Sequence, residues 1–311
     1  MVSISSGSQI RNRTSEFLKN QSIKLDHQDC QNLFNQLLNH LNYEYSIIPE
    51  KERIGKGHVY IAKYVAKEFF SFLSEKLDYN EDKYLKIAFN LFEYEMNEGN
   101  MILKYFSLLF LAEFILKYPQ SFKKAENMIE VAADDEEWTV RECAIFPIIS
   151  GIKKNPEYVL EYLTNLTNKM NQNLRRLVSE SLRQSNRVKW LRDPSKNDKV
   201  LNILSKLKTD ESIYVRKSVG NNLKDLSKYM PQKIITLMEA WIKKFKIKVQ
   251  DDLASEKGLN EEQKNLIWTI KHALRWIQKK NPEYHDRLGN ILGYNYVLYF
   301  DEKSNKYAEP R

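Results

Sequence analysis

Three segments of the chain repeat one pattern: Trp138-Thr-Val-Arg-Glu-Cys-Ala144, Asn173-Leu-Arg-Arg-Leu-Val178 and Tyr214-Val-Arg-Lys-Ser-Val219. Each contains an aliphatic residue, an arginine and a second polar residue, and each follows a turn rich in acidic or amide side chains. This recurrence is typical of helical repeats, in which stacked helix pairs place equivalent side chains at regular intervals along a concave wall. We therefore expect an all-α fold, a HEAT-like helical repeat solenoid with a concave basic groove.

The composition favours a helical array over a sandwich or a barrel. Only 9 of the 311 residues are glycine and 8 are proline, so the chain has little turn chemistry. The net charge of +8 comes from 49 basic and 41 acidic residues, which permits a nucleic-acid partner without requiring one. The cysteines, Cys30 and Cys143, lie far apart, which indicates a reducing cytoplasm rather than a disulfide framework.

Neither a secretory signal nor a membrane span is evident in the sequence. Residues 1–9 have no apolar h-region. The longest apolar stretch, residues 105–118, is interrupted by Glu113 and is too short to cross a bilayer. We expect a cytoplasmic protein that does not reside in a membrane.

Hydrophobic periodicity divides the chain into an N-terminal helical part and a regular array. We expect a flexible arm over residues 1–20, a single solenoid domain over 21–300 with clear repeats at 134–282, and a flexible tail over 301–311. The N-terminal helices are expected at 59–77, 82–96 and 101–118, the last of them buried and ended by Pro119. The repeat helices are expected at 134–153, 171–185 and 210–228, with shorter partners at 157–167, 198–206 and 232–244, and a fourth copy at 268–275.

The spacing of the repeat arginines locates an insertion. Arg141 and Arg175 are 34 residues apart, whereas Arg175 and Arg216 are 41 residues apart. The excess falls in residues 184–195, which contain Trp190. We expect a loop at one edge of the array, a place where repeat proteins often carry function.

Several kinds of catalytic site are excluded by missing motifs. The chain has no phosphate-binding GxxxxGK loop, no HExxH or paired-cysteine metal spacing, and no GxSxG nucleophile elbow. An enzyme built from this sequence would use carboxylates and aromatic rings, and we expect no metal site.

Trp138 and Glu142 are four residues apart, so a helix places the indole and the carboxylate on the same surface. Such a pair can hold a cationic group through cation–π attraction and charge neutralisation. The alternative is that Trp138 belongs to the repeat core and that Glu142 pairs with a neighbouring arginine. Spacing alone favours this second interpretation.

A basic run follows the second copy of the pattern. Arginine beside the free N–H groups of a helix start can bind phosphate, but it can equally bridge to the acidic turn of an adjacent repeat. We assign Arg141 and Arg216 to the structural role. The residues that we expect to contact a DNA backbone are Arg175, Arg176, Arg183, Arg187, Lys217 and Lys271.

Two longer strings resemble a known family: Asn173-Leu-Arg-Arg-Leu-Val-Ser-Glu-Ser-Leu-Arg183 and Asp210-Glu-Ser-Ile-Tyr-Val-Arg-Lys-Ser-Val-Gly-Asn-Asn-Leu-Lys-Asp-Leu-Ser-Lys228. They resemble the DNA alkylation repair family of HEAT-like glycosylases, and Trp268-Thr-Ile-Lys-His-Ala-Leu-Arg275 is similar to that family's last repeat. The resemblance covers roughly residues 134–282 and is closer to the AlkC type than to the AlkD type.

The resemblance implies base excision repair: removal of N3- and N7-alkylated purines such as 3-methyladenine from double-stranded DNA by a cofactor-free monomer in the bacterial cytoplasm or nucleoid. Glu142 falls where AlkC-like enzymes carry a glutamate, which implies the catalytic carboxylate. Trp138 and Trp190 fall at aromatic positions of the AlkD and AlkC types, and Asn221 stands where the AlkD type has an active-site tryptophan. These three are expected to contact the lesion or its sugar. Phe146 departs from the AlkC-like string, which has arginine there.

Two other functions remain open at this point. The basic wall can bind damaged or branched DNA without excising a base. Alternatively, the arginines only bridge repeats, and the groove is a protein-interaction scaffold that takes an acidic peptide.

Overall fold

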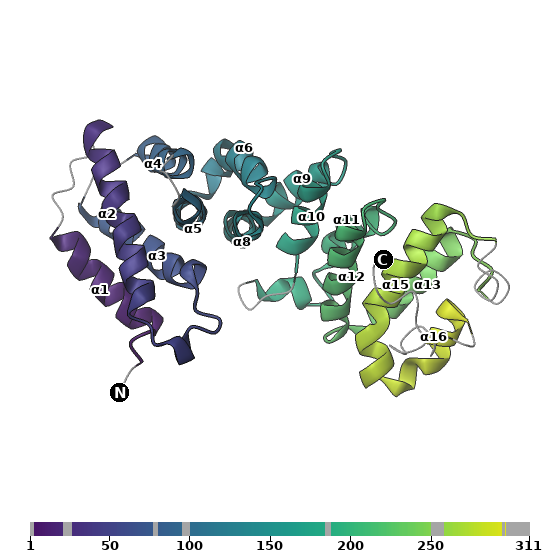
Figure 1. Ribbon diagram of the computed structural model, residues 1–311. Helices are drawn as coiled ribbons and strands as arrows, with labels where there is room; N and C mark the ends of the chain where they lie inside the picture. Colours follow the sequence, from purple (N-terminus) through teal and green to yellow (C-terminus); the bar gives the residue numbers. More distant parts are fainter. Residues whose placement is uncertain are drawn as a thin grey trace. The chain divides into compact units, whose positions relative to one another are not determined.

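The computed structural model describes residues 3–20, 27–76, 80–94, 100–183, 188–249, 258–293 and 296. Their regular elements are α-helices joined by turns and short 3-10 helices, and no β-strand occurs among them (Figure 1). The expected all-α helical-repeat fold is confirmed. The chain divides into two compact units, residues 1–156 and 157–311, where the sequence analysis expected one domain, and each unit is described by itself.

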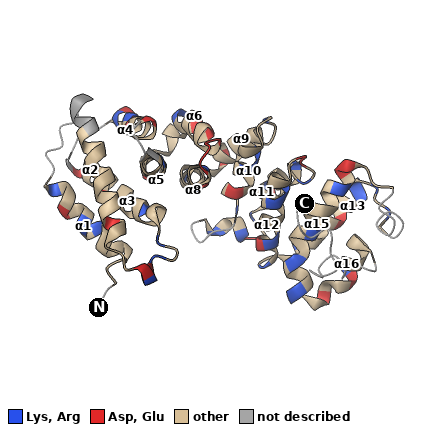
Figure 2. Cartoon of the chain, in the orientation of Figure 1, with Lys and Arg blue, Asp and Glu red and all other residues tan. Residues whose placement is uncertain are grey.

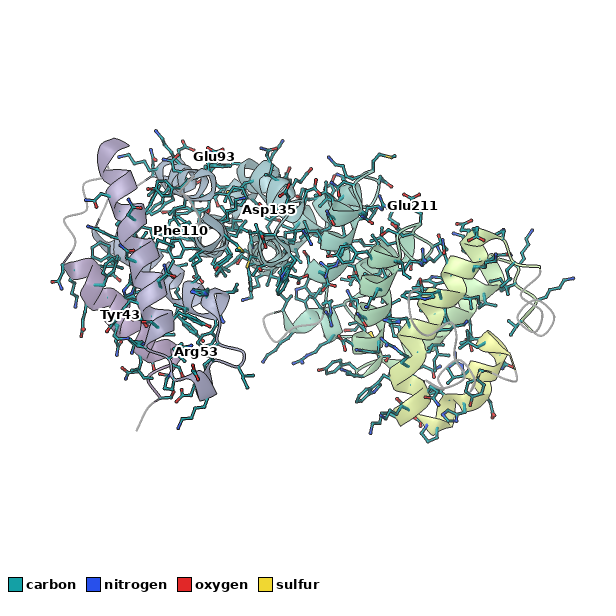
Figure 3. The ribbon with its side chains drawn as sticks, viewed as in Figure 1. Tyr43, Arg53, Glu93, Phe110, Asp135 and Glu211 are labelled. Carbon is teal, nitrogen blue, oxygen red and sulfur yellow. The ribbon has the colours of Figure 1, made fainter. Side chains whose placement is uncertain are left out.

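The first unit is built around α5, Asn100–Lys117, which packs against α3, α4 and α8 (Figure 1). Its other helices are α1 Gly7–Lys19, α2 His27–Ser46, α3 His58–Lys76, α4 Glu81–Glu93, α6 Phe122–Ala133, α7 Trp138–Cys143 and α8 Ile145–Lys154, with 3-10 turns at Glu50–Glu52 and Pro119–Ser121. Phe106, Phe110 and Phe114 of α5 are fully buried, and Phe110 is labelled in Figure 3. The expectation of a buried helix over residues 101–118 is therefore confirmed.

The segment expected as a flexible arm contains a packed helix. Ser6 caps α1 by accepting a hydrogen bond from the Gln9 N–H, and the side chains of Ile10 and Leu18 are fully buried. Arg13 forms an ion pair of 2.6 Å with the buried carboxylate of Glu44 on α2. The low hydrophobicity of this segment concealed the helix, because only one narrow face of α1 is apolar.

The helix expected over residues 134–153 is divided into α7 and α8. The Ala144 N–H still bonds to the Val140 carbonyl, but Pro147 has no N–H with which to continue the ladder. The pyrrolidine ring also crowds the carbonyl of Cys143, four residues earlier. α7 therefore ends at Cys143, and the chain turns at Ala144 before α8 begins.

In the second unit, α12 packs between α10 and α15. The helices are α9 Pro156–Leu166, α10 Gln172–Ser181, α11 Asp198–Lys206, α12 Ile213–Ser227, α13 Pro231–Lys244, α15 Glu261–Lys280 and α16 His285–Leu292, with 3-10 turns at Lys189–Arg192 and Pro282–Tyr284. These bounds follow the expected repeat helices and their partners within a few residues at most ends. The expected tail, residues 301–311, lies outside the described residues.

The fourth copy of the repeated pattern occupies a different place from the other three. α15 begins at Glu261 behind a capping box formed by Asn260 and Gln263, so Trp268 lies two turns inside the helix. The first three copies instead coincide with helix starts, at α7, α10 and α12. The residue at the arginine position of the fourth copy, Lys271, therefore has no preceding turn within its reach.

Candidate functional site

Three arginines hold the turns that precede α7, α10 and α12. In each case Nη1 donates two hydrogen bonds, of 2.5 to 2.9 Å, to the carbonyl oxygens six and five residues earlier. The acceptors are the carbonyls of Asp135 and Glu136 for Arg141, of Lys169 and Met170 for Arg175, and of Asp210 and Glu211 for Arg216. Figure 3 labels Asp135 and Glu211. Arg141 and Arg216 therefore have a structural role, but each binds the turn that precedes its own helix, where a bridge to the acidic turn of an adjacent repeat was expected.

Arg175 shares that structural role, which corrects its expected contact with DNA. Its Nε and Nη2 also donate to the two carboxylate oxygens of Asp210, at 2.6 and 3.0 Å, and its side chain is 9% exposed. The hydrogen bonds to Asp210 raise the pKa of Arg175 despite the cost of burial. A guanidinium committed to a buried carboxylate and two carbonyls has little capacity left for a phosphate.

Trp138 and Glu142 lie one turn apart on α7. Trp138 is the first residue of the helix and is 65% exposed, so it is not part of the repeat core. Glu142 is half-buried, and the adjacent Cys143 is buried on the inner side of α7. Burial and the nearby Glu142 charge raise the pKa of the Cys143 thiol to about 12. α7 therefore presents an accessible indole and a half-buried carboxylate, while Val140 and Cys143 on its inner side are buried.

A basic face runs along α12 and α15 in the second unit. We use this name for the side chains of Tyr214, Lys217, Asn221, Lys224 and Lys228 on α12 and of Trp268, His272 and Arg275 on α15. Successive members on each helix are three or four residues apart, so they form one stripe per helix. Figure 2 shows lysine and arginine along both helices. Arg275 bridges the stripes by donating a hydrogen bond to Asn221.

Arg176 and Arg183 flank this face on the α10 side, and both are paired. Arg176 stacks over the Tyr214 ring, 4.4 Å from its centroid, and lies 3.4 Å from Glu180. Arg183 bonds to Asp225 at 2.7 Å and to Glu180 at 3.2 Å. These contacts orient both guanidinium groups and offset much of their charge, so the DNA contacts predicted for them stay predictions.

The two predicted lysines have opposite environments. Lys217 is exposed on the basic face, as a backbone contact requires. Lys271 is only 8% exposed and lies in the middle of α15, which corrects its expected place in the groove. The helical period does not explain the difference, since Lys271 follows Trp268 by three residues and lies on the same side of α15 as Arg275. Burial alone sets Lys271 apart from Lys217.

Trp190 lies in the 3-10 turn Lys189–Arg192 and is half-buried. The neighbouring Arg192 stacks over the Tyr229 ring at 5.0 Å and donates a hydrogen bond to its hydroxyl. This turn thus joins aromatic and cationic side chains at the end of the inserted loop, where the sequence predicts function. Arg187 lies outside the described residues.

The sequence analysis overlooked His272 and Arg275 as site residues. Arg275 donates from Nε to the His272 carbonyl at 3.0 Å, and from Nη2 to His272 Nε2 at 2.8 Å and to Asn221 Oδ1 at 3.0 Å. The spacing of Trp268, His272 and Arg275 is the signal that indicates their shared face. Their contact with Asn221 joins residues 54 positions apart and is visible only in the fold.

Among the described residues, no group of three or more histidine, cysteine, aspartate or glutamate side chains is placed to hold a metal ion. No helix within the described part of the chain is long and apolar enough to cross a membrane. The chemistry that the described residues offer is that of carboxylates, aromatic rings and cations.

A family model described as "DNA alkylation repair enzyme" matches residues 62–277, more than half of the chain. The uncharacterized protein YhaZ of Bacillus subtilis (strain 168) is 31% identical over 165 residues, which is 51% of this chain. The alignment covers 39% of YhaZ, so the chain spans well under half the length of that relative.

Two solved structures have a similar fold. AlkD2 from Streptococcus mutans has a TM-score of 0.50 and 20% identity, with 78% of this chain and 97% of that chain covered. The Pseudomonas fluorescens alkylpurine DNA glycosylase AlkC, bound to DNA containing an abasic site analog, has a TM-score of 0.50 and 19% identity, with 93% of this chain and 67% of that chain covered. These similarities support the helical-repeat fold.

Proposed function

Because the chain belongs to the DNA alkylation repair enzyme family, we propose that it is a DNA glycosylase that excises cationic N3- or N7-alkylated purines from duplex DNA. The observation that carries the proposal is on α7, inside the matched range: Trp138 is exposed, and Glu142 follows one helical turn later. An exposed indole one helical turn before a carboxylate can receive a cationic base through its π face.

The chemistry of the lesion suits this pair. A purine alkylated at N3 or N7 is cationic, so its glycosidic bond breaks with little need for a general acid. As the bond breaks, positive charge develops on the sugar, and a carboxylate placed beside it lowers the barrier or orients the attacking water. We assign this role to Glu142. The indole of Trp138 attracts the cationic base through its π face.

The basic face of the second unit supports DNA as the partner. Lys217, Lys224, Lys228 and Arg275 lie along it, and cations in such a row suit the phosphates of a duplex. Trp190, in the turn Lys189–Arg192 of the same unit, is assigned a contact with the lesion or its sugar. We place this activity in the bacterial cytoplasm, at the nucleoid, with the protein acting as a monomer.

A non-catalytic binder of damaged or branched DNA is the second candidate, because the basic face needs no catalytic carboxylate in order to bind. The scaffold function is less favoured, because of the three repeat arginines only Arg175 bridges to the turn of the next repeat, at Asp210, and because Lys217 and Arg275 are exposed cations on the basic face.

A base-release assay tests the proposal. Purified protein in excess over methylated duplex DNA is expected to release free methylated purine. Glu142→Gln is expected to abolish release. Glu136→Gln, which removes the same charge from an exposed residue of the preceding turn, is the matched control and is expected to keep it. Salt-sensitive binding without release by the wild-type protein would contradict the glycosylase and support the binder.

A further inference from the structure

Arg275 differs from Arg175 and Arg183 in the groups that orient it. Its three hydrogen-bond acceptors are the His272 carbonyl, His272 Nε2 and Asn221 Oδ1, all of them uncharged. Among the described residues, no carboxylate lies within ion-pair distance of Arg275. Arg175 and Arg183, by contrast, each bond to an aspartate. The charge of Arg275 is held in place without being neutralised.

The hydrogen bonds of Arg275 leave the Nη1 nitrogen of its guanidinium available. Arginine has five N–H groups. The Nε hydrogen and both Nη2 hydrogens of Arg275 are accounted for by these three bonds. The two hydrogens of Nη1 have no acceptor among the described residues. The two N–H groups of Nη1 point in different directions, so each can donate one charge-assisted hydrogen bond to a phosphate oxygen.

His272 is itself fixed in position. Its ring stacks on Trp268 with centroids 4.9 Å apart and planes 11° apart. It also packs against α12 at Gly220, where an added Cβ would lie 2.7 Å from the His272 Cβ. Only a residue without a side chain at position 220 leaves room for this ring. Packing against Trp268 and Gly220 therefore fixes the position of the acceptor Nε2 beside Arg275.

The surrounding charges keep His272 uncharged. Burial, together with the nearby cations Arg275, Lys217 and Lys224, lowers the pKa of His272 to about 3. Near neutral pH the imidazole therefore accepts through Nε2 and carries its proton on Nδ1. Lys217 and Lys224 add positive charge around the same spot, while the carboxylate of Asp225 is shared by Arg183, Lys228 and Lys224.

We propose that Arg275 is a preorganised binding residue for one internucleotide phosphate of duplex DNA, and that His272 and Asn221 are its positioning residues. This proposal rests on the DNA-binding part of the proposed function and is independent of Glu142. Preorganisation is the advantage of the arrangement: the long side chain is ordered before DNA arrives, so less conformational entropy is lost on binding.

Binding of an undamaged duplex, measured by fluorescence anisotropy over a range of salt concentrations, tests Arg275 without requiring base release. Arg275→Gln is expected to weaken binding about tenfold, as loss of one charged hydrogen-bonding contact does. The slope of log affinity against log salt is expected to fall by about 0.9, the value for one phosphate. Lys280→Gln removes the same charge from an exposed residue on another side of α15 and is expected to bind nearly as the wild type does.

His272→Phe tests the positioning role, because phenylalanine keeps the stack on Trp268 but accepts no hydrogen bond from Arg275. It is expected to weaken DNA binding. Adding Arg275→Gln to His272→Phe is then expected to change the affinity little further, because the two residues act as one unit in the wild type. Asn221→Ala, at a half-buried position, is expected to weaken binding in the same way and serves if the histidine variant does not fold. His272→Gln, which supplies an amide acceptor, is expected to restore part of the affinity.

A duplex in which single phosphates are replaced by neutral methylphosphonates identifies the contact. The wild-type protein is expected to lose affinity at one position where Arg275→Gln is insensitive. If Arg275→Gln behaves like Lys280→Gln, the proposal is overturned even if base release is observed. If base release is absent but Arg275→Gln weakens DNA binding as expected, the phosphate-binding site is supported and the glycosylase activity is rejected. No DNA binding by the wild-type protein at low salt would overturn both.

Discussion

Replacing Arg175 with methionine tests the division between structural and DNA-contacting arginines. Methionine keeps much of the apolar stem of the side chain but removes the guanidinium. Arg175 and Asp210 are nearly buried, with 9% and 5% of their side chains exposed, and their two bonds measure 2.6 and 3.0 Å. Removing one partner leaves a buried charge unpaired, which costs about 3 to 5 kcal/mol of unfolding free energy.

Arg216 provides the internal comparison. It makes the same two bonds to turn carbonyls, but no carboxylate within the described residues pairs with it, and burial lowers its pKa. Arg216→Met is therefore expected to cost only about 1 to 3 kcal/mol, the value for lost hydrogen bonds to a charged group. In an Asp210→Asn background, Arg175→Met should lower the unfolding free energy by much less than it does in the wild type. The reason is that asparagine leaves no unpaired buried carboxylate behind.

Urea unfolding followed by circular dichroism measures these differences for the wild type, the three single variants and the double variant. The reasoning predicts Arg175→Met to be the least stable single variant. Equal losses for Arg175→Met and Arg216→Met would refute it. A stable Arg175→Met protein with weakened DNA affinity would restore Arg175 to the DNA-contacting set.

Three further predictions follow from the described geometry. Trp138→Ala is expected to change the unfolding free energy by less than about 0.5 kcal/mol, because the indole is 65% exposed, while base release from methylated DNA falls; a large loss of stability would show that Trp138 is a packing residue. Gly220→Ala is expected to cost about 1 to 3 kcal/mol in the same unfolding assay, because the new Cβ meets His272 at 2.7 Å; a stability equal to wild type would contradict that packing. His272 has a pKa of about 3 in the folded protein against 6.5 when unfolded, so the unfolded chain binds more protons between those values and stability falls as pH drops through that window, by up to about 1.4 kcal/mol per pH unit. His272→Phe should remove this slope, and an unchanged pH dependence of unfolding would show that His272 is not buried in its neutral form.

The sequence predicted most of the fold because its signals are local. A stretch that is apolar on nearly every face located α5, and Pro119 marked its end, since proline cannot continue a helix. The same rule at Pro147, applied earlier, would have divided the helix expected over residues 134–153. α1 was concealed because its apolar face holds few residues, and its stability depends on α2 and α3.

The candidate site was predicted less completely, because roles depend on contacts between distant residues. The pattern identified Arg141 and Arg216 as structural, but nothing local distinguishes Arg175 from them or reveals Asp210 as its partner 35 residues away. Lys271 took the arginine position of a fourth repeat, although α15 begins upstream and buries it. Arg275 and His272 gain their significance from Asn221 and Gly220 on another helix.

Single-turnover base release from methylated duplex DNA tests most directly whether Glu142, beside Trp138, is the catalytic carboxylate of a glycosylase. We expect the wild-type protein to release methylated purine, Glu136→Gln to do so at a similar rate, and Glu142→Gln to stay folded and DNA-bound but to release none. Release by Glu142→Gln at the wild-type rate would contradict this role for Glu142, as would the absence of release by a wild-type protein that binds the same DNA.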